Sequence, residues 1–206
     1  MARLTGPRNR LARREGVDLY LRSIDSPKAM LTRDFPPGQH GHSTKGKLSN
    51  YGTQLREKQK LKRIYGILEK QFRNYFIKAS KTKEVTGHAL LRFLEQRLDN
   101  VVYRAGFAVT RRQARQMVSH GAVEVNGRKV NIPSFQVDTE DQVRLKVAAE
   151  RGKKIQETHE KIKDSLAHDW IDTNAKELTA TIKRLPQRTD INFPIQEQLI
   201  VELYSK

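Results

Sequence analysis

The sequence predicts an α+β fold with three parts: an extended basic N-terminal arm (1–50), a mainly helical discontinuous domain (51–94 plus 165–206), and an inserted helix–helix–β-hairpin module with a small antiparallel sheet and an exposed linker (95–164). Three observations predict it. Apolar residues before the module recur at helical spacing. A helix start, a glycine stop and a hairpin turn then follow one another within residues 110–130. Alternating apolar residues after that hairpin predict a further strand.

The charge of the chain is strongly positive and unevenly distributed along its 206 residues. Lys and Arg number 40 and Asp and Glu number 23, which gives a net charge of +17. Residues 1–120 hold 26 basic and 9 acidic residues, whereas residues 121–206 hold 14 of each, so the whole excess lies in the first part. This balance favours a polyanionic partner, nucleic acid before an anionic membrane surface.

Several classes of protein are excluded by what the composition lacks. No apolar run exceeds three residues, so neither a transmembrane helix nor the apolar segment of a signal peptide is expected. The chain has no cysteine, which excludes disulfides, thiolate zinc sites and a cysteine nucleophile. We therefore expect a soluble, intracellular protein with no membrane partner.

The first 50 residues predict an extended arm, because Gly6-Pro7, Pro36-Pro37-Gly38 and other prolines and glycines interrupt every long periodicity. The segment holds 10 basic and 4 acidic residues. A disordered basic tail is the alternative. However, Val17, Leu19 and Tyr20 make the segment more apolar than a solvated tail requires, so we expect an arm that orders against RNA.

Helical spacing dominates the next segment. The apolar residues of the first predicted helix, from about 55 to 76, follow steps of three and four: Leu61, Ile64, Tyr65, Leu68, Phe72, Tyr75 and Phe76. Residues 51–80 hold eight basic residues against Glu57 and Glu69, too few acids for pairing along one helix, so we expect phosphate contacts. A second helix is predicted from His88 to Ala105, ending at Gly106.

The segment from Thr110 to Val130 predicts a helix followed by a hairpin. Thr110 is a good N-cap and Gln113 completes a capping box, so a helix should begin at Arg111 with its arginines facing outward. Gly121 supplies the left-handed position that ends the helix. His120, just before it, either contacts RNA or stabilises the helix C-terminus. Asn126-Gly127 is the preferred pair for a two-residue turn between strands.

The remainder of the chain predicts one more strand, a polar segment and an apolar tail. Residues 142–147 alternate as a strand after a polar turn at 138–141. Residues 150–168 suit a linker or an exposed helix. The tail that follows should close onto the helix at 55–76, which makes the helical domain discontinuous. Trp170 is expected to be a core aromatic rather than a base-stacking platform.

Two short patterns suggest chemistry that their context contradicts. Gly41-His-Ser-Thr-Lys-Gly-Lys47 matches the start of a phosphate-binding loop, but Leu48 stands where that loop needs Ser or Thr, and no apolar strand precedes it. The six histidines lack metal-ligand spacing. Asp99 lies beside arginines and is expected to be an ion-pair or capping partner. We predict no catalytic site, no cofactor, no metal and no small-molecule substrate.

The order helix, Gly106, helix resembles a helix-turn-helix, which would place residues 111–119 in a DNA major groove. That arrangement normally uses one recognition helix in a dimer. Here the charge spreads over the arm, the first helix and the module, so a partner wrapped on several sides fits better. Folded RNA, recognised by shape and phosphate, is such a partner.

The chain closely resembles the bacterial small-subunit ribosomal protein four family over nearly all of its length. The resemblance lies in Arg13-Arg14-Glu15-Gly16, Pro37-Gly-Gln-His-Gly41, Tyr51-Gly-Thr-Gln-Leu-Arg-Glu-Lys-Gln-Lys60, Gln71-Phe-Arg-Asn74, Arg97-Leu-Asp-Asn-Val-Val-Tyr-Arg104 and Leu199-Ile-Val-Glu-Leu-Tyr-Ser-Lys206. The inserted module resembles that family's RNA-binding domain. This domain is also appended to pseudouridine synthases and some tRNA synthetases, so an RNA-modifying enzyme accessory or a DNA-binding regulator is the alternative function.

The resemblance implies a non-enzymatic constituent of the small ribosomal subunit, cytoplasmic or in an organellar ribosome. It implies primary binding to the 5′ domain of 16S rRNA and nucleation of assembly there. It also implies small-subunit ribosomal protein five as a neighbour, an effect on decoding accuracy, and a place beside the mRNA entrance, where small-subunit protein three is a further candidate partner. Many relatives carry four cysteines in a zinc knuckle, so this cysteine-free arm should fold without metal.

Charge and resemblance together define the expected site. Lys45 and Lys47 match basic positions that the family places at the mRNA entrance, although this loop differs in length and sequence. The predicted rRNA-binding residues belong to the arm, the first helix and the module: Arg3, Arg13, Arg14, Tyr51, Gln54, Arg56, Lys58, Lys60, Lys62, Arg63, Arg73, Arg104, Arg111, Arg112, Arg115, His120, Arg128 and Lys129.

Overall fold

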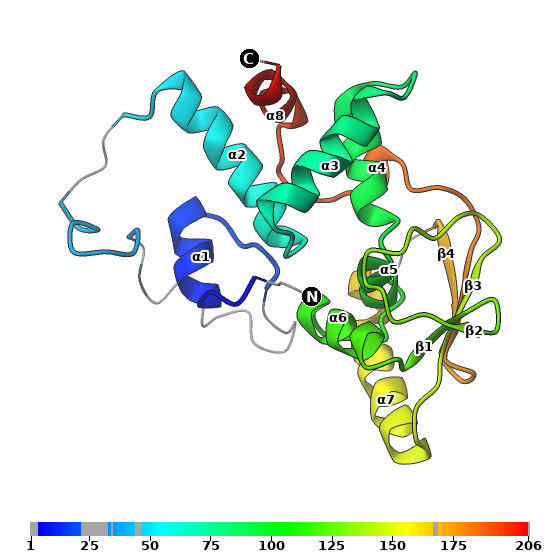
Figure 1. The fold of residues 1–206 in the computed structure, drawn as a ribbon. Coiled ribbons are helices and arrows are strands. Elements are labelled where there is room, and N and C mark those ends of the chain that lie inside the picture. Colours follow the sequence, from blue (N-terminus) through cyan, green and yellow to red (C-terminus); the bar gives the residue numbers. More distant parts are fainter. Residues whose placement is uncertain (1–3, 22–32, 34, 44–46, 167–168, 206) are drawn as a thin grey trace. The chain divides into compact units, whose positions relative to one another are not determined.

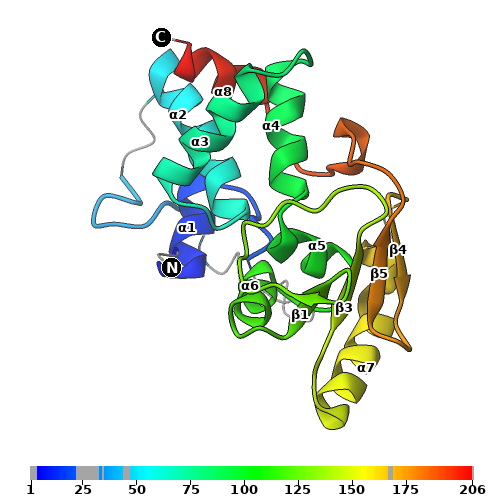
Figure 2. The ribbon, with the colours of Figure 1, turned by 45° about the vertical axis from the view of Figure 1, so that its right-hand side comes forward.

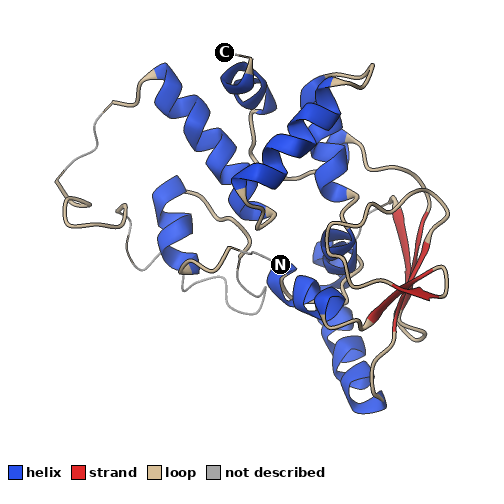
Figure 3. Ribbon diagram, in the orientation of Figure 1, coloured by secondary structure: helices blue, strands red, loops and turns tan. Residues whose placement is uncertain are grey.

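The computed structural model describes residues 4–21, 33, 35–43, 47–166 and 169–205. The chain divides into two compact units, the first formed by Met1–Leu90 with Phe193–Lys206 and the second by Leu91–Asn192. Helices together with one antiparallel sheet confirm the α+β class (Figure 3). None of the helices in the described part of the chain is long and apolar enough to cross a membrane.

The first unit is helical. Ser49 caps its longest helix, because the Ser49 hydroxyl accepts a hydrogen bond from the backbone N–H of Gly52 at 3.2 Å. Within the expected arm, a short helix is present where no proline or glycine interrupts the sequence. The helices of this unit are α1 (Arg8–Glu15), α2 (Asn50–Ile64), α3 (Glu69–Ser80), the first half of α4 (Thr86–Glu95) and α8 (Glu197–Tyr204) (Figure 1).

The single helix expected from about 55 to 76 is wrong, because the chain turns between α2 and α3. Gly66 adopts a left-handed conformation with φ of 63°. The N–H of Ile67 bonds to the carbonyl of Lys62 at 3.0 Å, and the N–H of Gly66 bonds to that of Arg63 at 3.1 Å. These two bonds form a glycine cap that ends α2. The apolar periodicity continues across the turn and therefore conceals it.

The end of the chain packs on α2 and α3. The Gln54 amide donates to the Glu202 carboxylate of α8 at 2.8 Å. The Tyr204 ring stacks on Phe76, with centroids 4.6 Å apart, and Ile200 is buried. Figure 2 shows α8 beside α2. Residues 193–206 join this unit, a shorter segment than the expected 165–206.

The second unit combines helices with a five-stranded sheet. All strand pairs are antiparallel, in the order β2-β1-β3-β5-β4. The elements after α4 are α5 (Leu98–Arg104), α6 (Arg111–Ser119), β1 (Val123–Val125), β2 (Arg128–Lys129), β3 (Gln142–Leu145), α7 (Ala149–Leu166), β4 (Ile171–Asn174), β5 (Thr179–Ile182) and a 3₁₀ turn at Arg188–Asp190.

Two strands of this sheet lie in the segment that the sequence places in the helical domain. In β5, Ala180 and Ile182 are buried and alternate with half-buried threonines, which is the period-two pattern of a strand that packs on one face. This strand pairs with β3 and β4. The expected boundary at residue 165 therefore differs from the observed one, because residues 171–182 complete the sheet of the module.

The helix expected from His88 to Ala105 is likewise two helices. It breaks at Arg97, where ψ is 133°, and a loop of the same unit takes over the backbone bonds. The N–H of Leu98 donates to the carbonyl of Phe135 at 2.9 Å, and that of Asp99 donates to Pro133 at 3.2 Å. A distant loop thus satisfies the donors that a continuous helix would direct to its own preceding turn.

The segment at 150–168, expected to be a linker or an exposed helix, contains the continuous helix α7, and Ile155 on this helix is buried. The Gln156 amide donates to the Lys176 carbonyl in the turn between β4 and β5 at 2.9 Å. Figure 2 shows α7 alongside these strands. Trp170 is only 1% exposed, which confirms that it is a core residue.

Candidate nucleic-acid interface

The start and stop signals around α6 are largely confirmed. The Thr110 hydroxyl accepts from the N–H of Gln113 at 3.2 Å. The Gln113 side chain returns to the N–H of Val109 at 3.1 Å, one residue before the position that a capping box uses. Asn126 and Gly127 both have positive φ, 50° and 76°, as a two-residue type I′ turn requires. The turn sets β2 beside β1.

Arg111 points into the unit, so the prediction that it faces outward is wrong. Its side chain is 7% exposed, and its Nε donates to Asn100 at 2.8 Å. The guanidinium lies 4.4 Å from the centre of the Tyr103 ring, within range of a cation–π contact. Steps of three and four from Arg111 lead to Ala114 and Val118, both buried. This spacing in the sequence could have placed Arg111 on the inner face.

A second predicted contact, Arg104, is also turned inward. Its guanidinium forms two hydrogen bonds to the buried Glu95 carboxylate, at 2.9 Å and 2.7 Å. The Asn100 amide donates to the same carboxylate at 2.6 Å. Asn100 therefore links Glu95 and Arg104 to Arg111 in one buried network. Its side chains hold α4, α5 and α6 in fixed positions.

A neighbouring ion pair contacts the same side of α6, one turn further along the helix. Arg97 is fully buried and forms two hydrogen bonds to Asp99, at 3.1 Å and 2.9 Å. Arg115 of α6 approaches the same carboxylate at 3.7 Å. The prediction that Asp99 is an ion-pair partner is confirmed. Arg115 is thus partly committed to a contact within the unit.

Four predicted residues of the module lie toward solvent. Arg112 is half-buried, and His120, Arg128 and Lys129 are exposed. The Lys129 side chain runs across Gly121, because a Cβ added at Gly121 would lie 2.2 Å from Lys129 Cε. Lys129 therefore places the end of its side chain beside Gly121, the residue that follows His120 at the C-terminal end of α6.

Most predicted cations of α2 are paired with acids of other helices or of α2 itself. Glu15 of α1 receives Arg56, at 3.3 Å, and Arg63. Ion pairs therefore account for five of the eight cations in residues 51–80, because the pairing runs between helices as well as along one. The full set is Arg56 and Arg63 with Glu15, Lys58 and Lys62 with Glu69, and Lys60 with Glu57.

The two acids that join helices have opposite pKa shifts. Burial raises the pKa of Glu15 and outweighs the nearby arginines and Lys60. Burial also acts to raise the pKa of Glu69, but hydrogen bonds from Lys58, Lys62 and Tyr204 outweigh it and lower the pKa to about 2. Glu69 is therefore ionised at neutral pH.

The remaining predicted residues differ in their exposure. Arg14, Lys47, Tyr51 and Arg73 are exposed. Arg13 is half-buried, and its Nε donates to the Phe35 carbonyl at 3.0 Å. Gln54, predicted as a contact, is buried against α8. Arg3 and Lys45 lie outside the described residues.

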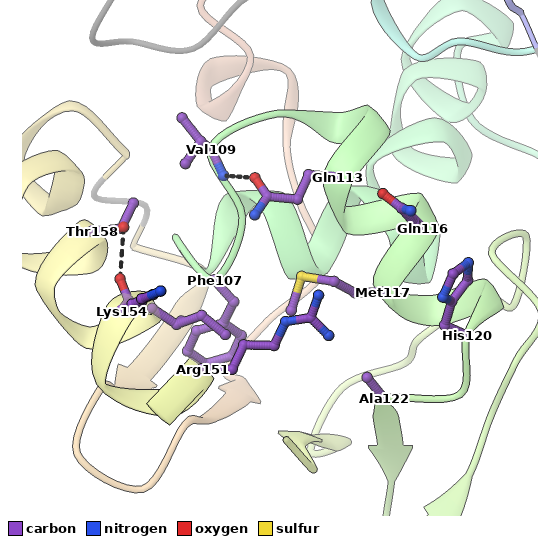
Figure 4. Close-up of a pocket in the computed structure, with 11 residues that line it drawn as sticks. Phe107, Val109, Gln113, Gln116, Met117, His120, Ala122, Arg151, Lys154 and Thr158 are labelled. Carbon is purple, nitrogen blue, oxygen red and sulfur yellow. Dashed lines mark hydrogen bonds between the residues drawn. The ribbon is translucent and has the colours of Figure 1, made fainter. Parts of the chain in front are cut away.

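Sequence reasoning missed the cations at the start of α7, because the composition of that segment suits a linker. Arg151, Lys153 and Lys154 are all exposed. Arg151 and Lys154 line a cavity of about 340 Å³ between α6 and α7, together with Gln113, Gln116, Met117 and His120 of α6 (Figure 4). The run Arg151-Gly-Lys-Lys154 was the only signal in the sequence.

Comparison with known proteins finds two family matches that follow one another along the chain. Residues 3–95 match the family "Ribosomal protein S4/S9 N-terminal domain", and residues 96–143 match the family "S4 domain". The chain is 53% identical to small ribosomal subunit protein uS4 of Dichelobacter nodosus over 207 residues, with both chains covered completely. It is 52% identical to the uS4 proteins of Thermodesulfovibrio yellowstonii and Aeromonas hydrophila, again over the full length of both chains.

Proposed function

The chain belongs to the family of small ribosomal subunit protein uS4, and from this premise we propose that it is a structural, RNA-binding protein of the small ribosomal subunit whose main partner is 16S rRNA. The observation that carries the proposal is the positive excess in residues 1–120, part of which lies on solvent-facing side chains. Phosphates of folded RNA are the natural counter-charges of such a surface.

Exposed cations occur on at least three separate sets of elements, which favours a partner that is contacted at several places. Arg8, Arg10 and Arg14 project from α1. Lys70 and Arg73 project from α3, and Lys81 and Lys83 follow it. Arg128 and Lys129 project from β2. A folded RNA offers many phosphates at different orientations, whereas one groove of a DNA duplex offers a single track.

The finer parts of the proposal follow from the relationship to uS4 proteins. We propose that the rRNA contact lies in the 5′ domain and nucleates assembly there. We also propose that small-subunit protein five is a neighbour, that the contact influences decoding accuracy, and that Lys45 and Lys47 lie near the mRNA entrance. Within this role the buried Glu95–Asn100–Arg104 network positions α6 and takes no part in binding.

Filter binding over a series of salt concentrations tests the proposal. The protein should prefer a 16S 5′-domain transcript to duplex DNA of equal length. The double variant Arg128→Gln/Lys129→Gln should flatten the dependence of log affinity on log salt by roughly 0.7–0.9 for each phosphate that is no longer neutralised. Lys176→Gln/Lys183→Gln removes the same charge from exposed positions of the β4–β5 region and should leave the slope nearly unchanged. Equal affinity for RNA and duplex DNA would favour a DNA-binding regulator and overturn the proposal.

A further inference from the structure

The face of α6 that meets α7 differs from its other faces. Gln113, Gln116, Met117 and His120 follow steps of three, one and three, so they lie along one side of the helix. Arg111, Ala114 and Val118 occupy the buried side. Figure 4 shows the glutamines, Met117 and His120 along the side of α6 that borders the cavity.

The lining of the cavity combines an apolar floor with polar and cationic groups. Phe107, Met117 and Ile155 are buried apolar side chains that contribute to the lining. Gln113 and Gln116 supply amides. The Gln113 oxygen already accepts a hydrogen bond from the N–H of Val109, so this amide offers its NH2 group as a donor, whereas the Gln116 amide can donate and accept. Arg151 and Lys154 supply positive charge from α7 (Figure 4). Among the described residues that line the cavity, none is acidic.

This combination matches one chemical group of RNA better than others. A nucleobase has an apolar face and an edge of donors and acceptors, and it is always flanked by phosphates. The volume of about 340 Å³ falls within the range of ~300–1,000 Å³ that is typical of small-ligand sites. A peptide with acidic side chains could satisfy the cations, but amides beside buried apolar side chains, one of them aromatic, suit a base better.

The surroundings supply a path for the chain that would carry the base. His120 lies at the end of the cavity nearest the glycine stop of α6, and Lys129 runs across that glycine. Phosphates held at Arg128 and Lys129 would therefore lie close to a base in the cavity. The other wall, α7, lies outside residues 96–143 that match the S4 domain, so it adds a second side to that domain's helix.

We propose that the cavity between α6 and α7 receives one unstacked base of the bound RNA, with Met117 and Phe107 against its face, the two glutamines at its edge, and Arg151 and Lys154 on the flanking phosphates. This inference rests on the proposed RNA-binding function and names one subsite of it. It assigns Arg151 and Lys154 to RNA binding, whereas Lys153, on the same turn of α7, lies outside the lining.

Matched charge variants on α7 provide the first test. Arg151→Gln and Lys154→Gln, made in the full chain, should each weaken binding to the 16S 5′-domain transcript by about five- to tenfold, because each removes a direct contact. Lys153→Gln removes the same charge from the same helix turn and should weaken binding less than twofold. If all three variants lose affinity equally, the cations of α7 act only through long-range electrostatic attraction to the RNA, and the proposal is wrong.

A second test asks whether a base, and not only phosphate, enters the cavity. Since the chain has no cysteine, Gln116→Cys creates a unique position for a short photo-crosslinker, with exposed Thr139→Cys as the control. The Gln116→Cys crosslink should map to one or two nucleotides. An abasic substitution at the crosslinked nucleotide should weaken RNA binding by the wild-type protein about tenfold. It should weaken RNA binding by the Arg151→Gln variant much less.

Two results of this second test would overturn the subsite: dispersed crosslinks, or an abasic transcript that binds as well as the intact one. These results differ from failure of the proposed function, in which the wild-type protein would show no preference for the transcript over duplex DNA.

Discussion

At the scale of single residues, the arginines of the second unit differ in whether their side chains point into the unit or toward solvent. Arg97, Arg104 and Arg111 lie on inner faces and form hydrogen bonds to Asp99, Glu95 and Asn100. Removing one partner of such a buried pair leaves the other desolvated and uncompensated, which is why breaking a pair costs far more than the pair contributes. Arg112 is half-buried, and Arg128 is exposed to water.

This difference predicts that substitutions at two adjacent arginines affect different properties, stability in one case and RNA binding in the other. Arg111→Ala should lower the free energy of unfolding by about 1–3 kcal/mol, because it removes the bond to Asn100 and the contact with Tyr103. Arg112→Ala, at a half-buried position, should cost less stability than Arg111→Ala but should flatten the salt dependence of RNA affinity. Urea unfolding and filter binding measure the two effects. A flattened slope in Arg111→Ala with unchanged stability would show that Arg111 contacts RNA directly.

Glu69 predicts a pH dependence for the first unit. Its pKa of about 2 in the folded protein lies below the ordinary value of 4.5, so its stabilising contribution is complete above pH 4.5 and is lost as the pH falls toward 2. The carboxylate is almost half exposed, so we expect no more than about 1 kcal/mol. Glu15, whose pKa is raised, acts with the opposite sign.

The two acids can be separated by substitution. Glu69→Gln should lower stability at pH 6 and approach the wild-type stability near pH 2, as measured by urea unfolding at each pH. The Glu15 contribution is common to both proteins and cancels in the difference. A stability difference that is independent of pH would exclude the ion pairs of Glu69 as its cause.

At the scale of elements, the sequence predicted what the chain does locally but not where long-range partners interrupt it. Helical periodicity found α2, α3, α4 and α5, yet it merged them in pairs, because the breaks depend on the Gly66 cap and on the loop carbonyls that capture the N–H groups of Leu98 and Asp99. The helix-hairpin signal was strong because caps and type I′ turns are short-range features. The strands β4 and β5 are short, and their place in the sheet depends on the long-range pairing of β5 with β3, which local sequence patterns do not show.

Prediction of the candidate RNA-binding residues from sequence has the same limit, because it does not reveal long-range partners. Charge and spacing identified Arg112, Arg128 and Lys129, which face solvent. They did not identify Glu15 as the partner of Arg56 and Arg63, because Glu15 lies 41 residues from Arg56 in sequence. Nor did they identify Arg151 and Lys154, whose significance depends on the packing of α7 beside α6.

The α6–β1 connection allows a prediction that separates stability from binding. Gly121→Ala and Gly127→Ala each place a side chain at positive φ, 71° and 76°, and each should cost about 1 kcal/mol of stability. A Cβ at Gly127 meets nothing within 4 Å, whereas one at Gly121 would displace the end of Lys129. Thermal unfolding should therefore be similar for both variants, while RNA affinity should fall more in Gly121→Ala. Equal affinities would argue against a role for the position of Lys129.

At the scale of the whole molecule, the chain contains two cores that respond to different changes. Leu61, Ile64 and Phe72 form the centre of the first unit, and Val101, Val118 and Val143 belong to the second. The positive excess of residues 1–120 is shared between the two units, so neither carries the proposed RNA contact alone. The N-terminal segment belongs to the first unit, where Glu15 of α1 pairs with Arg56 and Arg63 of α2.

Deletion of residues 1–45 tests whether this segment is a structural part of the first unit as well as a source of charge. The shortened protein should bind the 16S 5′-domain transcript more weakly, because it lacks nine cations. It should also melt at a lower temperature by circular dichroism, because Arg56 and Arg63 lose Glu15 and the first unit loses the buried Ala12, Leu19 and Leu21.

The fluorescence of Trp170 reports the unfolding of the second unit alone, so it shows which unit the deletion destabilises. Trp170 is the only tryptophan of the chain, and it is buried in the second unit. Because each unit has its own apolar core, the fluorescence transition of Trp170 should remain within about 2 °C of the full-length value while the helical signal of the first unit melts earlier. Deletion of residues 1–7, which spares α1, is the control and should leave both transitions in place. If the Trp170 transition moved as far as the circular dichroism transition, the two units would have to unfold as one cooperative body. If both probes gave an unchanged melting temperature, α1 would contribute positive charge to RNA binding but nothing to the stability of the first unit.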